Sequence, residues 1–416
     1  MKRAISTGMM TLLAVFLTAF VVDCSGGEKG PTASAEKILP GNEIRLTHTV
    51  LMAGLQNPWD LAFTPDGAML FTEKCRGLSV RLADGTVRRL FGTRGSAVVA
   101  DDLFCQGQSG MCGVAVDPDF ADNRFLYVYM ASRLDKPSAN RVVRLVIDEG
   151  YATVSDRRDI VTGISFKNSA TLWGRAGAHS GGRLEFSPAD GFLYITTGDN
   201  HEGPLPQDLS RLGGKVLRVD RHGQAASGNN TPSGGDRRIF TYGHRNVQGI
   251  AFRPVTGRPF ACEHGPGHSD EVTPLTAGGN GGWDPQPASG VSCAGNYCGY
   301  TSNRPDGAPT AMTDLARFPD AMRPSWNNHG ESAGMGDCVF LSGAHWQAWD
   351  GRLAVAFLRG SRIELLQLDP SGMTVAAGAV AGLPSQRMRS LVQGRDGALY
   401  VATDGGEVWR IAATSR

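Results

Sequence analysis

After residue 40 the chain is a series of short segments in which apolar and polar residues alternate, separated by turns rich in Pro, Asp and Gly. An alternation with a period of two is typical of β-strands. One unit recurs: a strand, a tight turn and a second strand rich in β-forming residues. We find six copies, at residues 61–73, 113–130, 183–199, 249–263, 338–360 and 390–404.

The spacing of these hairpins predicts the fold. Their turn positions are separated by 46 residues at the closest, between Gly351 and Gly397, and by 94 at the widest, between Gly257 and Gly351. Such intervals fit four-stranded units, and repeats of this size favour a β-propeller over a sandwich, which gives no reason for one hairpin to recur. We therefore predict an all-β protein, a six-bladed β-propeller of four-stranded antiparallel blades. Residues 278–309, rich in Gly, Pro and Asn, are expected to form an inserted loop over one face.

The N-terminal residues have the pattern of an export signal. Lys2 and Arg3 precede an apolar run from Met9 to Val22, which is shorter than the roughly 20 residues of a membrane span. We predict an export signal over 1–23, a flexible tether over 24–40 and a propeller domain over 41–416. Cys24 resembles the acylated residue of a bacterial lipoprotein, although Asp23 departs from that pattern. Lipidation at Cys24 and ordinary secretion both stay open, so the expected location is periplasmic or cell-surface.

Composition excludes some classes of function. Charged residues make up 19% of the chain, below the roughly 25% of soluble domains, and hydrophobic residues 41%, which argues against disorder. The formal net charge of +1 provides no electrostatic footprint for nucleic acid, and we expect no nucleic-acid partner. The 55 glycines have no collagen-like period and indicate many tight turns.

Seven cysteines follow Cys24, and an exported protein can oxidise them. Short spacing makes Cys105–Cys112 and Cys293–Cys298 the natural local pairs. No C-x-x-C motif is present, which argues against a zinc site. An odd number requires at least one thiol to stay free or to pair elsewhere. The remaining three are expected to be small buried hydrophobes: Cys75, Cys262 and Cys338.

Candidate catalytic residues stand next to glycines at the entries of predicted inner strands. His179, in Ala178-His179-Ser180-Gly181-Gly182, precedes the third hairpin, and histidine titrates near neutral pH, as a general base requires. Arg245 and Asn246 precede the fourth hairpin and could bind an anionic or carbonyl-rich ligand. A structural histidine and a solvated blade edge are the alternatives. Because strand entries on one propeller face converge by symmetry, their recurrence indicates a shared site.

Further residues at the same positions suggest what the site binds. Arg387 and Arg389 precede the last hairpin and Arg359 follows the fifth, so the arginines would need an anion between them, such as a small polycarboxylate. Gln108 precedes the second hairpin. The carbonyls of Gly265 and Pro266 at a strand end are hard donors suited to Ca²⁺.

Seven ordered blocks of sequence resemble the soluble aldose dehydrogenases that depend on pyrroloquinoline quinone (PQQ), a family of six-bladed propellers. The resemblance covers about residues 48–412. Its blocks are NPWDLAFTPDG (57–67), GQSGMCGVAVDPDF (107–120), HSGGRLEFSPADGFLYITTGDN (179–200), QDLSRLGGKVLRVD (207–220), YGHRNVQGIAFRP (242–254), EHGPGHSDE (263–271) and RMRSLVQGRDGALYVATD (387–404).

The resemblance implies roles for these residues. His179 would be the base on the anomeric hydroxyl of a sugar while hydride passes from C1 to the quinone, and Arg245 would stabilise charge on the quinone oxygen. The carbonyls of Gly265 and Pro266 would bind the Ca²⁺ that polarises the cofactor. The expected cofactors are PQQ and calcium, and the expected partners are a sugar substrate and an external electron acceptor. Residues expected to hold PQQ are Gln108, Arg245, Asn246, Arg359, Arg387 and Arg389.

The chain also departs from the family. Ala178 stands where the glucose enzymes have an acidic residue, Arg359 stands where they have a lysine, and residues 272–335 match poorly. Two other functions stay open on the sequence alone. Calcium-containing propellers also hydrolyse sugar lactones, a reaction that needs no arginine cluster, and a propeller can be a binding module without catalysis.

Overall fold

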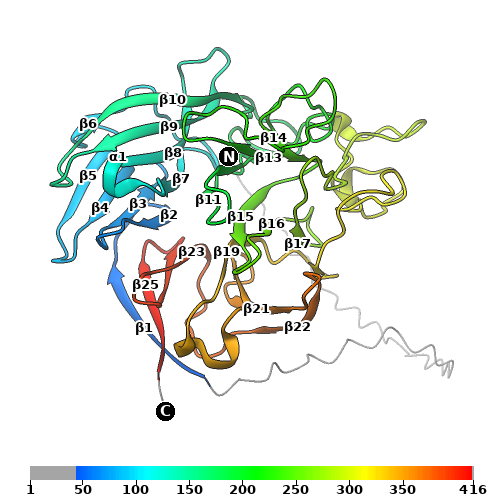
Figure 1. The fold of residues 1–416 in the computed structure, drawn as a ribbon. Helices are drawn as coiled ribbons and strands as arrows, with labels where there is room; N and C mark the ends of the chain where they lie inside the picture. Colours follow the sequence, from blue (N-terminus) through cyan, green and yellow to red (C-terminus); the bar gives the residue numbers. More distant parts are fainter. Residues whose placement is uncertain (1–43, 415–416) are drawn as a thin grey trace, which may run out of the picture. The chain divides into compact units, whose positions relative to one another are not determined.

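The computed structural model describes residues 44–414, which form six antiparallel sheets around a central axis (Figure 1). Five sheets have four strands each, and the first has an additional short parallel strand at its outer edge. The predicted all-β six-bladed propeller is therefore confirmed. Among the described residues, no helix is long and apolar enough to cross a membrane. The predicted export signal, Cys24 and the tether lie outside the described residues and stay predictions.

The blades are numbered in chain order, and the strands of each blade are given from the axis outwards. Blade 1 contains β2 (Pro58–Phe63), β3 (Met69–Glu73), β4 (Gly77–Arg81), β5 (Val87–Gly92) and β6 (Val98–Val99). Blade 2 contains β7 (Met111–Val116), β8 (Phe125–Ser132), β9 (Ala139–Ile147) and β10 (Val154–Ile164), and blade 3 contains β11 (Leu184–Phe186), β12 (Leu193–Thr196), β13 (Lys215–Val219) and β14 (Ile239–Tyr242). Blade 4 contains β15 (Val247–Phe252), β16 (Pro259–Glu263), β17 (Glu271–Pro274) and β18 (Trp326–Asn327).

Blade 5 contains β19 (Met335–Phe340), β20 (Leu353–Phe357), β21 (Ile363–Leu368) and β22 (Thr374–Ala379). Blade 6 contains β23 (Met388–Gln393), β24 (Leu399–Thr403), β25 (Val408–Thr414) and β1 (Arg45–Met52). The described helices are single turns or little more: α1 (Phe120–Asn123), η1 (Ala294–Asn296), η2 (Thr301–Asn303) and η3 (Ala344–Trp349).

Each predicted hairpin is the inner pair of strands of one blade. In blade 1, for example, Leu61 of β2 pairs with Phe71 of β3 across the turn at Gly67, whose φ of 92° favours glycine. All residues of β3 and β20 are buried, because these strands are covered by neighbouring blades on both faces. The hairpin pattern was informative because these strands combine β-forming residues with short turns.

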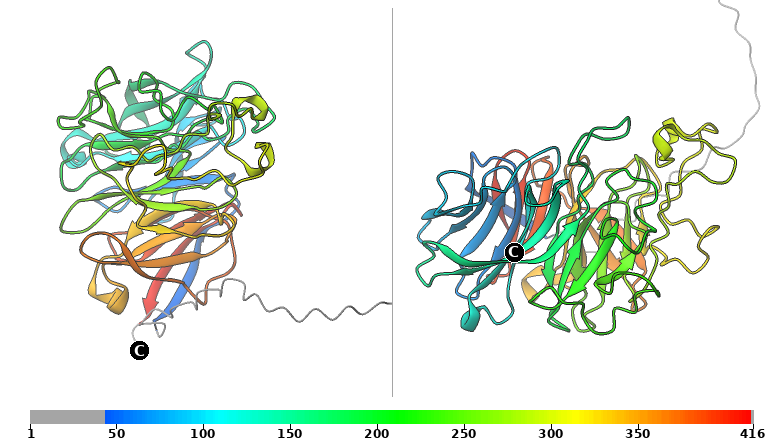
Figure 2. Two further views of the ribbon diagram at one scale, coloured as in Figure 1. Left: turned by 90° about the vertical axis from the view of Figure 1, so that its right-hand side faces the viewer. Right: turned by 90° about the horizontal axis from the view of Figure 1, so that it is seen from above.

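The ring is closed by strands from the two ends of the described chain. β1 pairs antiparallel with β25, from Arg45 opposite Thr414 to Met52 opposite Val408, and supplies the outer strand of blade 6. Figure 2 shows these two strands side by side, β1 in blue and β25 in red. Closing the ring in this way covers an edge strand that would otherwise expose unpaired backbone groups.

The predicted inserted loop lies between β17 and β18. It first follows the outer edge of blade 3, where Gly278 N donates to Phe240 O at 2.8 Å and Trp283 N donates to Gly243 O at 2.9 Å. We call residues 278–309 the inserted segment. Because it runs along β14 towards the loop that enters β15, its aromatic residues reach the face of the propeller that carries the candidate residues.

A buried ion cluster lies on the axis, where inner strands of three blades meet. The Arg183 guanidinium pairs with Asp60 and, at 3.3 Å, with Asp337, and it stacks over Trp59 at 4.5 Å. Asp60, Arg183 and Asp337 are each at most 3% exposed. Burial, followed by the neighbouring Asp60, raises the pKa of Asp337 to about 7, although Arg183 opposes the shift.

Residues 44–414 contain three disulfides, and only one matches the predicted local pairs. Cys293–Cys298 is confirmed, but the Cys105–Cys112 prediction is wrong, because Cys105 pairs with Cys75. Cys112 is a buried free thiol, in line with the odd number. Cys75, Cys262 and Cys338 are therefore bonded rather than simple buried hydrophobes, and Cys262–Cys338 joins β16 of blade 4 to β19 of blade 5.

Arg183→Met tests the axial cluster. Two buried carboxylates would lose their cation, which costs about 3–5 kcal/mol when such a pair is broken. Folding raises the pKa of Asp337, so ionisation of this acid in the folded protein costs stability as the pH rises towards its folded pKa. The loss of stability caused by Arg183→Met should therefore be larger at about pH 8 than at about pH 5. Denaturant unfolding at both pH values measures it. Arg410→Met, which removes the half-exposed pair with Asp396, is the control and should change stability by about 1 kcal/mol or less. Equal losses at the two pH values would contradict the interpretation.

The inter-blade disulfide should contribute more stability than the local one. Cys262–Cys338 spans 76 residues and Cys293–Cys298 spans 5. In the chain-entropy model the longer loop is worth about 4 kcal/mol and the shorter one about 2. Replacing each pair by serines and comparing denaturant midpoints tests this order. A larger loss from the local pair would show that strand packing already holds blades 4 and 5 together.

Candidate active site

The candidate residues meet because propeller topology brings particular chain positions to one rim. In every blade, the entry of the first strand and the exit of the second lie at the same end of the sheet. His179 precedes β11, Asp199 follows β12, and Arg245 precedes β15. Asp199 N donates to Arg245 O at 2.7 Å, which joins blades 3 and 4 directly at this rim.

His179 is buried and held on both its backbone and its ring. Its N–H donates to Gln108 Oε1 at 3.0 Å, and its Nδ1 lies 2.6 Å from Asp199 Oδ1. An Nδ1–H donated to this carboxylate leaves Nε2 as the proton acceptor. Burial, followed by the positive charge of Arg245, places the pKa of His179 well below its ordinary value. The ring is therefore neutral, as a proton acceptor must be.

Asp199 is a site residue that the sequence analysis missed. Its carboxylate is completely buried and also accepts from Trp283 Nε1 and Tyr297 Oη, each at 2.8 Å, and from His201 N at 2.9 Å. It lies in Thr-Gly-Asp-Asn, directly after the second strand of the third hairpin. Because Asp199 follows the second strand of the hairpin that His179 precedes, the sequence could have indicated that the two residues lie close together. Its aromatic donors come from the inserted segment, where sequence showed no periodicity.

Arg245 is positioned by a buried glutamate on the next strand. Glu263 Oε1 accepts from the backbone N–H groups of Arg245 and Asn246, and Glu263 Oε2 lies 3.0 Å from His244 Nδ1. The guanidinium donates through Nη1 to His264 O at 3.0 Å and through Nη2 to Tyr300 Oη at 2.9 Å. Its Nε is buried without a partner. A buried unpaired donor is costly, so this atom is suited to a ligand oxygen.

Asn246 and Gln108 hold the loop of the base. Asn246 Oδ1 accepts from Gly181 N at 3.1 Å and from Gln248 Nε2 at 3.2 Å. Gln108 is exposed at the rim and contacts His179 from the entry of blade 2. Both side chains therefore act on the base loop, in addition to any ligand they bind.

The remaining arginines have carboxylate partners within the chain. Arg389 donates to Asp404 Oδ1 and Oδ2, both at 3.1 Å, and Arg387 donates to Asp404 Oδ2 at 2.8 Å. Arg359 is exposed and pairs with Glu331 at 2.7 Å. Their mutual repulsion is thus already reduced by Asp404 and Glu331. The sequence suggested that these arginines need an external anion between them. Asp404 and Glu331 already balance part of their charge.

A cavity of 220 Å³ lies between the blades at this rim. Lys74 and Arg389 contribute positive charge to it, and Asp404 contributes a carboxylate. Its polar walls are suited to a ligand with several oxygens. The lining residues are Asn57, Pro58, Trp59, Lys74, Gly107, Gln108, Ser180, Gly181, Gln248, Arg389 and Asp404.

The Gly265–Pro266 turn is built by a buried aspartate. Asp270 Oδ1 accepts from Gly265 N at 2.9 Å and from Ser332 Oγ at 2.6 Å, and Oδ2 accepts from Ala333 N at 2.6 Å. At Gly265 a Cβ would lie 1.8 Å from His268 O, so only glycine fits. Within residues 44–414 no cluster of three His, Cys, Asp or Glu side chains is arranged for a metal. Metal binding here would depend on main-chain carbonyls.

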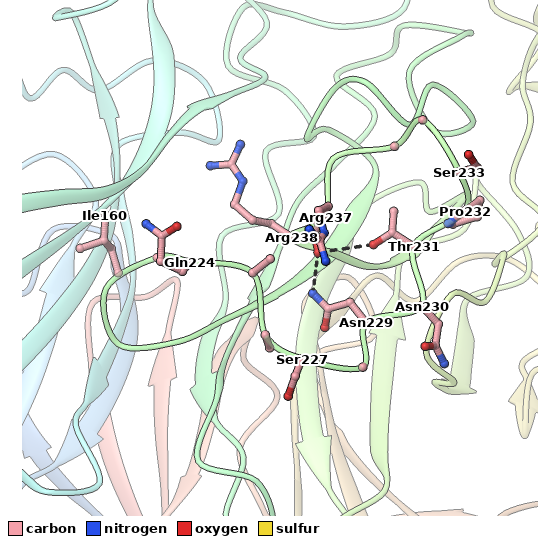
Figure 3. A pocket seen from close by; sticks show the side chains of 16 residues that line it. Ile160, Gln224, Ser227, Asn229, Asn230, Thr231, Pro232, Ser233, Arg237 and Arg238 are labelled. Carbon is pink, nitrogen blue, oxygen red and sulfur yellow. Dashed lines mark hydrogen bonds between the residues drawn. The ribbon is translucent and has the colours of Figure 1, made fainter.

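A larger cavity of 1040 Å³ lies elsewhere, in the loop between β13 and β14 (Figure 3). The loop leaves β13 at the rim opposite His179. Polar side chains around it hold the loop: Asn229 Nδ2 donates to Arg218 O and Arg237 O, each at 2.9 Å, and Thr231 Oγ1 donates to Ile239 O at 2.6 Å. We therefore place the functional site in the smaller cavity and the adjoining His179–Arg245 region.

Comparisons with known proteins agree with this fold. The family model described as glucose/sorbosone dehydrogenase matches residues 55–410. Aldose sugar dehydrogenase YliI of Escherichia coli is 30% identical over 372 residues, which cover 87% of this chain and 92% of that protein. Quinoprotein glucose dehydrogenase B of Acinetobacter calcoaceticus is 26% identical, over 85% of this chain and 84% of that protein.

Solved structures extend the similarity to three dimensions. The PQQ-bound aldose sugar dehydrogenase of Streptomyces coelicolor has a TM-score of 0.67 and 25% identity, and the similarity covers 89% of this chain and 99% of that one. The soluble aldose sugar dehydrogenase of E. coli in its apo form has a TM-score of 0.73 and 25% identity, over 89% and 100% of the two chains. The chain belongs to the glucose/sorbosone dehydrogenase family, which identifies it as an oxidoreductase and confirms the predicted resemblance.

Proposed function

We propose that this protein is a PQQ- and Ca²⁺-dependent dehydrogenase that oxidises aldose sugars at the anomeric hydroxyl and releases the lactone. The observation that carries the proposal is a buried neutral histidine on a carboxylate, next to a buried guanidinium with an unpaired Nε. Oxidation of an alcohol by hydride transfer requires a base that takes the hydroxyl proton. A fixed cation beside it stabilises the negative charge that develops during the transfer.

The residues present fit PQQ, which is a planar tricarboxylate. Lys74 and Arg389 provide positive charge in the cavity, Gln248 and Gln108 provide amides, and Arg245 Nε is an unpaired buried donor. We assign cofactor binding to Gln108, Arg245, Asn246, Arg387 and Arg389. Arg359 belongs to the same proposal, although its ion pair with Glu331 must open first. When bound, PQQ would supply the two-electron acceptor for the hydride.

The protein groups would handle the proton. His179 Nε2 accepts the proton of the anomeric hydroxyl, and Asp199 stabilises the imidazolium that forms through its contact with Nδ1. Arg245 remains charged and stabilises negative charge that develops next to it. The inserted segment excludes water, since Trp283 and Tyr297 cover Asp199 and are each 1% exposed.

Calcium would bind to the main-chain oxygens of Gly265 and Pro266, together with oxygens of the bound cofactor. Hard carbonyl ligands suit Ca²⁺, and Asp270 fixes the turn that presents them. The electrons would pass to an external acceptor, as in any dehydrogenase that keeps its cofactor. Three disulfides in the described part of the chain support an oxidising compartment, in agreement with the predicted export.

Reconstitution with base variants tests the chemistry. The protein should oxidise aldoses with an artificial dye only after addition of both PQQ and Ca²⁺. His179→Gln should lower kcat by at least about 100-fold, and Asp199→Asn by a similar factor, because the amide supports the wrong tautomer. PQQ affinity, measured from its absorption spectrum, should change less. A variant that keeps full kcat would remove that residue from the mechanism.

Arginine variants separate the dehydrogenase from a lactone hydrolase. Arg389→Gln should weaken PQQ binding by about 10- to 100-fold, the value of one charge-assisted hydrogen bond. Arg387→Gln should have a smaller effect, because its side chain is half exposed. Arg410→Gln, which removes an arginine–aspartate pair outside the site, is the matched control. Lactone hydrolysis that persists unchanged in Arg389→Gln, without sugar oxidation in the parent protein, would instead favour the hydrolase.

A further inference from the structure

A second histidine lies directly against the proposed base. The rings of His179 and His201 have centroids 3.6 Å apart and planes inclined by 34°. Both residues are tied to one carboxylate oxygen, because Asp199 Oδ1 contacts the His179 ring at Nδ1 at 2.6 Å and accepts from the backbone N–H of His201 at 2.9 Å. His201 therefore cannot move without affecting the surroundings of the base.

Tyr300 connects His201 to the cation of the site. Its Oη accepts from Arg245 Nη2 at 2.9 Å and lies 2.7 Å from His201 Nε2. A guanidinium has no acceptor, so the Tyr300 hydrogen is free to be donated to His201. The assignment that uses both contacts and also gives the Tyr300 hydrogen an acceptor is a directed chain from Arg245 to Tyr300 to His201. In it, His201 Nε2 is an acceptor and the ring proton lies on Nδ1.

The surroundings constrain the ring further. In this assignment the Nδ1–H of His201 is buried without an acceptor, a cost that the hydrogen bond from Tyr300 has to offset. The ring packs against Gly174, where a Cβ would lie 2.3 Å from Nδ1. The backbone of Tyr300 is held by its N–H, which donates to Asn303 Oδ1 at 3.0 Å.

We propose that Tyr300 and His201 form a positioning pair: Tyr300, carried by the inserted segment, holds His201 as a neutral imidazole stacked on His179, so that the base keeps an uncharged neighbour during turnover. This proposal rests on the proposed function and specifies how its base is maintained. A positive charge on His201 would face the imidazolium that forms on His179 at ring-stacking distance, and like charges at that separation disfavour each other.

The environment of His201 agrees with a neutral ring. Burial, followed by the electrostatic interaction with the neighbouring His179 ring, lowers the pKa of His201 to about 2, against the opposing effect of Asp199. Tyr300 adds a hydrogen bond to the neutral form, which favours it further. The titratable or charged groups around the ring are Lys167, His179, Asp199, Arg245, Tyr297 and Tyr300.

The pH dependence of sugar oxidation by PQQ-loaded protein tests the pair. Tyr300→Phe keeps the ring but removes the donor, so the pKa of His201 should rise and the acid limb of kcat should move up by about one pH unit, the value of one hydrogen bond. On that limb we expect kcat to fall by up to about 10-fold relative to the parent at the same pH, with KM changed by less than about 3-fold. Tyr400→Phe, which removes a hydroxyl bonded to Asp396 in blade 6, is the matched control and should leave the profile unchanged.

A second substitution shows whether His201 is the titrating group. Gln at position 201 does not titrate, so the double variant Tyr300→Phe/His201→Gln should recover the parent acid limb. An acid limb that stays raised in the double variant, or one that never moves in Tyr300→Phe, overturns the proposal.

The tautomer is measurable without any activity. In protein labelled with ¹⁵N-histidine, NMR should show the parent His201 neutral at neutral pH with its proton on Nδ1, and His201→Gln identifies the signal. A proton on Nε2 or a charged ring in the parent overturns the proposal, even if Tyr300→Phe fails to fold. If the parent does not oxidise sugars, the proposed function fails while this measurement still decides the state of His201.

Discussion

The site depends on one buried carboxylate. Asp199 accepts from His179, from the backbone of His201, and from Trp283 and Tyr297 of the inserted segment, and it is completely enclosed. A buried carboxylate is tolerated only when it is hydrogen-bonded, so these donors must stay together for the fold to remain stable. The same contacts orient the base. The contacts that stabilise this rim are therefore the same contacts that orient the His179 ring.

Much of the fold was predictable because its signal is local. Each inner hairpin is contiguous in sequence, so six alternating segments revealed six blades, and the position of His179 and Arg245 at strand entries placed them on one rim. The pairing of β1 with β25 was not predictable in this way, since it joins residues more than 350 apart, such as Arg45 and Thr414. Sequence proximity also misled the disulfide prediction, because Cys105 meets Cys75 of the neighbouring blade.

The site shows the same division between local and distant information. Glycine-flanked polar residues marked His179, Arg245 and Gly265, but Asp199 and Tyr300 gain their roles from contacts across blades. Charge balance was also hidden: Asp404 lies between Arg387 and Arg389 only because β24 ends beside the entry of β23. A count of arginines therefore overstated the excess of positive charge. Paired arginines still bind anions, since Asp404 can share them with a ligand at the cost of weaker contacts.

The inserted segment explains how a symmetric fold carries an asymmetric site. Six similar blades produce six similar strand entries, yet aromatic side chains cover the rim above blades 3 and 4, where Trp283 and Tyr297 reach Asp199 and Tyr300 reaches Arg245. The Cys293–Cys298 bond lies within this covering part. Water exclusion strengthens the contacts of His179 and Arg245, because the effective dielectric falls when solvent is removed. The position of the candidate site is thus set by the segment that covers the propeller and not by the blades alone.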